Sequence, residues 1–147
     1  MRLTFTKRSG KYDDLLLERT GHPPETISCP KQGIIPHDMI HYAVESTLAH
    51  SGFLSLVAEG HSAGFATIGG ETEECVERLV ENFQAEMWGG RIPAPELVAS
   101  YEQACAAHGH AAVPVSVTDV GIIRACLDDL TAKWAAVEVN GSLTLEL

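Results

Sequence analysis

Alternating apolar and polar residues open the chain and predict a small antiparallel sheet. Residues 2–7 alternate in this way, a Ser-Gly pair then provides a turn, and a second apolar run extends through Leu17. A short third strand over residues 25–29 is predicted beside this hairpin. It ends at Pro30, because proline cannot donate a hydrogen bond to a strand ladder.

After Gly33 the apolar residues recur at helical spacing, which predicts about four helices. The apolar run 53–58 is too short to classify by its period, and the glycine-rich segment 60–70 is typical of a loop. The predicted helices run from about 36 to 50, from Glu71 to a stop at Gly89-Gly90, through residues 97–105, and from the capping candidates Thr118 and Asp119 through Trp134.

The last residues, 143–147, predict a strand that returns to the N-terminal sheet. The expected fold is therefore α+β: a small antiparallel sheet, built from the N-terminal hairpin and the C-terminal strand, covered by about four helices. A chain of 147 residues is close to the common domain size, so a single domain over residues 1–147 is expected.

The charge balance argues against nucleic acid and membranes as partners. The chain carries 20 acidic and 10 basic residues, a formal net charge of −10, whereas binding to phosphate backbones depends on clustered Lys and Arg. It contains no apolar run of signal-peptide or membrane-span length, so a cytoplasmic location is expected. The four cysteines are widely spaced without a C-x-x-C pair, which favours buried thiols.

The densest polar cluster lies on the first predicted helix, 36–50. On a helical wheel, His37, His41 and Glu45 fall at about 0°, 40° and 80°, so they share one face. Histidines four residues apart can bind one metal ion, with a further ligand supplied from elsewhere. The sequence thus predicts a divalent-metal site, for zinc as an example, formed by these three residues, with Asp38 orienting a histidine or serving catalysis. In the alternative, Asp38 caps the helix and His41 pairs with Glu45.

The motif P-H-D-x-x-H-x-x-V-E contains these residues, from Pro36 to Glu45. It resembles a block in a small family of uncharacterised bacterial proteins with a β-rich start and a helical middle. The resemblance covers about ten residues. It implies a bacterial origin and transfers no activity.

A second candidate site is the G-x-S-x-G motif of residues 60–64, which has Ser62 at its centre. In hydrolases this motif forms a strand-to-helix elbow that exposes the serine hydroxyl. Only four residues follow it before Gly69-Gly70, and no aspartate lies between Ser62 and His110, the last histidine. A chance match is the simpler interpretation, and Ser62 stays a testable nucleophile.

Three functional hypotheses follow. The leading one is a divalent-metal-binding or hydrolytic site on helix 36–50, completed by a histidine from the loop or a later helix. The alternative is a non-catalytic interaction module that forms a homodimer or binds a protein or small molecule. The third is a serine hydrolase that uses Ser62. The acidic residues of the helix after residue 70 are interpreted as a solvated face: Glu73, Glu74, Glu77 and Glu81.

Overall fold

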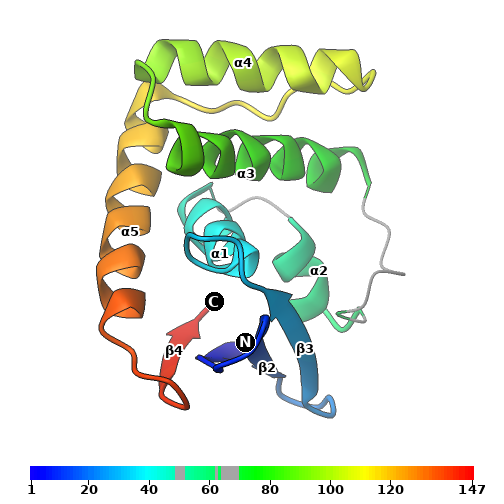
Figure 1. The fold of residues 1–147 in the computed structure, drawn as a ribbon. Helices are drawn as coiled ribbons and strands as arrows, with labels where there is room; N and C mark the ends of the chain where they lie inside the picture. The colour runs from blue at the N-terminus through cyan, green and yellow to red at the C-terminus, as the bar shows by residue number, and fades with distance from the viewer. Residues whose placement is uncertain (49–51, 62, 64–69) are drawn as a thin grey trace.

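The computed structural model describes residues 1–48, 52–61, 63 and 70–147, and it confirms the α+β fold. Within these residues it has four strands and five helices (Figure 1). The elements are β1 (Arg2–Thr6), β2 (Tyr12–Glu18), β3 (Glu25–Pro30), α1 (His37–Leu48), α2 (Phe53–Ala58), α3 (Glu71–Gly89), α4 (Ala94–Ala107), α5 (Val117–Ala135) and β4 (Ser142–Glu146).

The four strands form one antiparallel sheet in the order β3-β2-β1-β4. The predicted return of the C-terminal strand is confirmed, since β4 pairs with β1 over its whole length. In register, Leu3 lies opposite Leu17, and Phe5 lies opposite Leu15. These four side chains are fully buried, because alternate residues of a strand point to the same face of the sheet.

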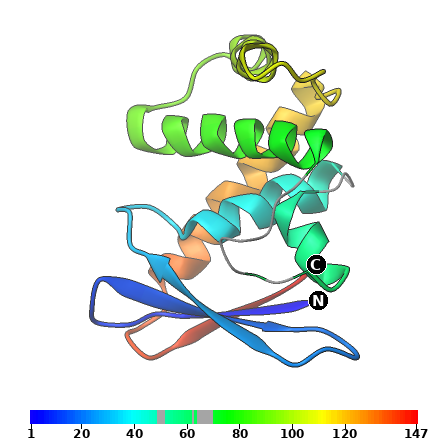
Figure 2. The ribbon, with the colours of Figure 1, turned by 90° about the vertical axis from the view of Figure 1, so that its right-hand side faces the viewer.

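The helices cover that apolar face in successive layers (Figure 2). Helix α1 lies directly over the sheet, α3 packs on α1, and α4 packs on the far side of α3. Helix α5 runs alongside and contacts both α1 and α4. Because α1 is covered on both sides, most of its side chains in the middle of the helix are buried, among them Met39, Ile40, Ala43 and Val44.

The fifth helix, α2, is formed by the apolar run that sequence periodicity left unclassified. Leu54 and Val57 are its buried residues, and α2 packs against α1. Its six residues are too few to display a helical period, so only this packing distinguishes it from a strand.

Helix α5 holds α3 in place through a buried ion pair. The guanidinium of Arg124 donates to both carboxylate oxygens of Glu86, at 2.9 and 2.7 Å. The start of α5 has a capping box in which Ser116 is the N-cap and Asp119 is the third helical residue. Thr118, one of the two capping candidates from the sequence, thus lies inside the first turn instead of capping it.

None of the helices in the described ranges combines the length and the apolar character that crossing a membrane requires.

Candidate metal centre

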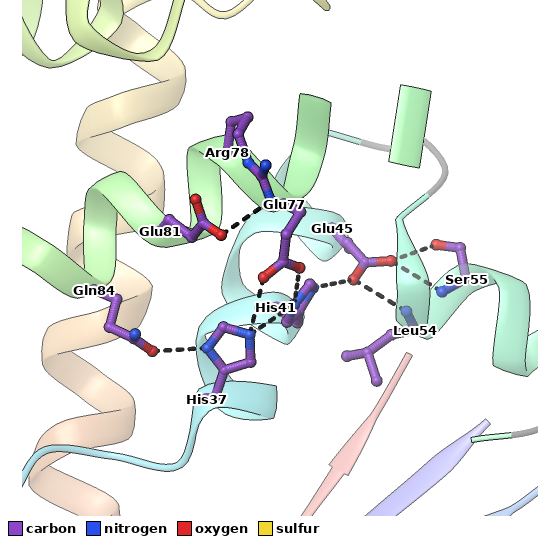
Figure 3. Close-up of polar contacts among 9 residues, drawn as sticks. All are labelled: His37, His41, Glu45, Leu54, Ser55, Glu77, Arg78, Glu81 and Gln84. Atoms are coloured by element: carbon purple, nitrogen blue, oxygen red, sulfur yellow. Dashed lines mark hydrogen bonds and ion pairs between the residues drawn. The ribbon is translucent and has the colours of Figure 1, made fainter. Parts of the chain in front are cut away.

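His37 and His41 lie one turn apart on α1 and present their rings toward α3 (Figure 3). The Nε2 atoms of the two rings are 3.1 Å apart. His41 is buried, with a side chain 4% exposed, whereas the His37 side chain is 36% exposed. One ring is therefore enclosed and the other is at the edge of the site.

The third member of the cluster is Glu77 from α3. Its Oε1 lies 3.2 Å from Nε2 of His37, and its Oε2 lies 2.7 Å from Nε2 of His41. The three side chains bring candidate ligand atoms within 4.8 Å of one another. Two imidazoles and one carboxylate thus converge from two helices that pack face to face.

Both histidine rings are fixed from behind by acceptors at Nδ1. Nδ1 of His37 lies 2.7 Å from Oε1 of Gln84 on α3. Nδ1 of His41 lies 3.0 Å from Oε2 of Glu45 on its own helix. Each Nδ1 must carry the proton to donate to such an oxygen, which leaves the Nε2 lone pairs free to bind an ion.

Glu45 in turn is held by the start of α2. Its carboxylate accepts hydrogen bonds from the backbone N–H of Leu54 at 3.2 Å and of Ser55 at 2.9 Å, and from the Ser55 hydroxyl at 2.9 Å. Gly52 makes room for this contact, since a Cβ at that position would lie 2.3 Å from Cδ of Glu45. The ring of His41 is therefore linked through Glu45 to the position of α2.

In the metal-free protein, a proton lies between Nε2 of His41 and the carboxylate of Glu77. Burial opposes the charged form of His41, but hydrogen bonds to Glu45 and Glu77 and the charges of these carboxylates raise the pKa of His41 to about 10. Burial likewise opposes ionisation of Glu77, yet the hydrogen bonds from His37 and His41 hold the pKa of that carboxyl well below its usual range. His41 and Glu77 thus form an ion pair, and a metal cation could bind between them by displacing the proton on Nε2 of His41.

The distances among the ligand atoms suit a single ion. Ligands bound at about 2.1 Å lie about 3.4 Å apart at tetrahedral angles and about 3.0 Å apart at right angles. The 3.1 Å between the two Nε2 atoms falls within this range, while the two Glu77 oxygens each face a different ring, at 3.2 and 2.7 Å, and one ligand atom from each residue lies within 4.8 Å of the others. The imidazole and carboxylate donor set also matches the types that bind zinc, iron and manganese.

The cluster opens onto a pocket of about 760 Å³. Its walls come from β2, β3, α1, α2 and α3, and they include His37 and His41. A volume of this size is typical of sites for small-molecule ligands. Three protein ligands leave coordination positions for water or a substrate, and the pocket gives such molecules access.

The structure separates the residues that the sequence grouped together. His37 and His41 converge as predicted, but the carboxylate that joins them is Glu77, while Glu45 binds the opposite side of the His41 ring. Asp38 lines the pocket and accepts a long hydrogen bond of 3.7 Å from the thiol of Cys29, so its partner is a cysteine and not a histidine.

The remaining candidates do not complete the cluster in the described part of the chain. Ser62 lies outside the described residues, and the element before its motif is the helix α2 instead of a strand. The ring of His108 pairs with Arg78, and that of His110 lies 3.8 Å from Glu71.

Glu77 is the residue that sequence reasoning missed, because its helix was interpreted as a solvated acidic face. Its side chain is only 17% exposed. A weak signal was present: Glu77 is three residues before the buried Val80, about 60° from it on the helical wheel, at the edge of the apolar stripe. Gln84, four residues after Val80, lies at the same edge.

Comparison with known proteins adds no assignment, since no family model, curated protein or solved structure matches the chain.

Proposed function

We propose that this protein binds one divalent transition-metal ion through Nε2 of His37, Nε2 of His41 and the carboxylate of Glu77, and that it is a metal-dependent hydrolase. The convergence of these ligand atoms, with both Nδ1 atoms already bound to acceptors, carries the proposal. Two histidines and one glutamate with a fourth position for water form a known type of catalytic zinc site.

The proposed chemistry uses a metal-bound water. A zinc ion lowers the pKa of its water to about 7 and polarises a carbonyl oxygen, so hydroxide is supplied at neutral pH. Within the pocket, the carboxylate of Asp38 is a candidate proton acceptor. Glu45 would act as a positioning residue, because it holds His41 from the side away from the ion.

An iron(II) centre is the second candidate. The 3.1 Å between the two Nε2 atoms is closer to the roughly 3.0 Å of ligands at right angles than to the roughly 3.4 Å of a tetrahedral pair. Two histidines and one carboxylate with open positions are also the ligand set of non-haem iron oxygenases. The identity of the bound metal decides between the two chemistries.

The test is metal analysis by mass spectrometry of untagged protein purified without oxygen, together with Glu77→Gln and Glu81→Gln variants. Glu81 is a matched control, one turn along α3, because it pairs with Arg78 and is 51% exposed. We expect close to one equivalent of zinc or iron in the wild type and in Glu81→Gln, and a large loss in Glu77→Gln. Equal metal content in all three proteins would overturn the assignment of Glu77.

Catalysis is tested separately, on the metal-loaded protein. Ester and amide hydrolysis that disappears in His41→Ala and survives in Ser62→Ala would support the metal-dependent route. Hydrolysis that depends on Ser62 and not on His41 would favour the serine hydrolase.

A further inference from the structure

The walls of the pocket beside the metal centre indicate which molecules it accepts, an inference that rests on the proposed function. The apolar lining comes from the sheet, from α2 and from Ala63 beyond the end of α2: Leu17, Ile27, Phe53, Leu54, Val57 and Ala63. The ring of Phe53 meets the ring of His41 edge to face, with centroids 6.1 Å apart. An apolar surface therefore continues up to the metal ligands.

The polar groups of the pocket are predominantly acidic. Among the described lining residues, four carry carboxylates and one carries a permanent positive charge, Arg78. Its two terminal nitrogens are already engaged, since one donates to Glu81 at 3.0 Å and the other lies 3.2 Å from Nε2 of His108, whereas its buried Nε has no hydrogen-bond partner among the described residues. The carboxylates are those of Asp38, Glu74, Glu77 and Glu81.

The charges add up to a pocket that repels anions. With the four carboxylates, the guanidinium of Arg78 and the protonated ring of His41, the metal-free pocket carries a net charge of −2, and a divalent ion that displaces the His41 proton changes it to −1. Charge interactions are stronger in such a partly enclosed, apolar setting than in water. Among the described lining residues, a phosphate or carboxylate group on the substrate would meet only the cations Arg78 and, in the metal-free protein, His41, and both are already paired with carboxylates.

We propose that the pocket binds a small, mainly apolar molecule without negative charge, whose single carbonyl group reaches the metal ion. The substrate class is thus an uncharged or cationic amide or ester, and phosphate esters and anionic acids are excluded. The apolar part of the molecule would lie against Ile27 and Val57, while its carbonyl would approach His37 and His41.

The pocket also connects the occupant to the metal ligands. Leu54 contributes its side chain to the wall and its backbone N–H to the carboxylate of Glu45. Glu45 in turn orients His41. A molecule that packs against α2 therefore contacts the element that fixes one of the metal ligands.

The experiment compares three molecules with one skeleton: 4-phenylbutanamide, 4-phenylbutylamine and 4-phenylbutanoate. Their binding to chelator-treated, full-length protein is followed by NMR shifts of the Leu54 and Val57 amides. Without metal, only the apolar walls and the charged side chains of the pocket contribute to the binding of these molecules. We expect the amide and the amine to bind at least ten times more tightly than the carboxylate, and the amide to gain affinity when zinc is added.

Reversing one charge tests whether the acidic side chains cause the weaker binding of the carboxylate. In Glu74→Lys the preference against the carboxylate should shrink at least threefold, whereas Glu102→Lys, the same change on the exposed face of α4, should leave it unaltered. Far-UV circular dichroism verifies that both variants are folded. Equal binding of all three molecules to the wild type, or no binding by any, would overturn this inference.

These outcomes are independent of the metal proposal. Loss of metal in Glu77→Gln would still support the metal centre if the pocket bound none of the three molecules. Conversely, selective binding of the amide and amine to a protein that takes up no metal would retain the pocket and reject the centre.

Discussion

Replacing Glu45 by glutamine tests whether Glu45 orients the ring of the proposed metal ligand His41. The Glu45 side chain is 0% exposed and accepts four hydrogen bonds, from His41, from the backbone of Leu54, and from the backbone and hydroxyl of Ser55. A glutamine keeps one acceptor oxygen, which can still serve Ser55. Its amide N–H groups would face the N–H of Leu54 and Nδ1 of His41, where an acceptor is needed.

Two effects of different size should follow from Glu45→Gln. The buried Leu54 N–H is left without an acceptor, at a cost of about 1–3 kcal/mol, and the loss of a buried charge partner of His41 adds to it. We expect the free energy of unfolding of the metal-free protein to fall by about 3 kcal/mol. His41 would also exchange its ring proton to Nε2, which blocks the ligand atom, so metal affinity should fall about 10- to 100-fold.

The stability change is measured by urea unfolding of the chelator-treated protein, and the affinity change by competition with a coloured chelator. Glu102→Gln is the control, because it makes the same substitution at an exposed position of α4. The reasoning would be refuted by a folded Glu45→Gln protein that binds metal as tightly as the wild type, since His41 would then need no partner at Nδ1.

Three further predictions concern pH, backbone space and the serine motif. In metal-free protein, the raised pKa of His41, about 10 against a usual 6.5, contributes stability that is complete below pH 6.5 and lost as pH rises to about 10. The lowered pKa of Glu77 contributes stability above its usual 4.5, so it is lost as pH falls further below that value. The urea concentration at the midpoint of unfolding should therefore decline from pH 6.5 to 10 in the wild type and change less in His41→Ala. The same pH dependence in both proteins would contradict the ion pair of His41 with Glu77. Gly52→Ala should lower the unfolding midpoint and weaken metal binding, because its Cβ would fall 2.3 Å from Cδ of Glu45; unchanged values in both assays would show that α2 shifts freely. Ser62→Ala should keep full metal content and full metal-dependent hydrolysis, and a loss of turnover alone would return the serine to the reaction.

Most of the fold could be predicted from local sequence pattern. Strand alternation in residues 2–6 and 12–18 and the acidic first turn of α3 are properties of neighbouring residues, and both appear in the structure. The pattern failed for α2, whose six residues show no period, and for the cap of α5, where Ser116 and not Thr118 accepts the hydrogen bond.

The sequence by itself determined the paired histidines of the site, because one helical turn brings His37 and His41 together whatever surrounds them. Tertiary structure alone decided the carboxylate. Glu45 satisfies the same helical spacing, but the ring of His41 has two nitrogens on opposite edges. Because of how α2 and α3 pack on α1, Glu45 contacts Nδ1 and Glu77 contacts Nε2. The pattern of neighbouring residues does not predict which carboxylate contacts which nitrogen, because this depends on which face of α3 packs against α1 in the folded core.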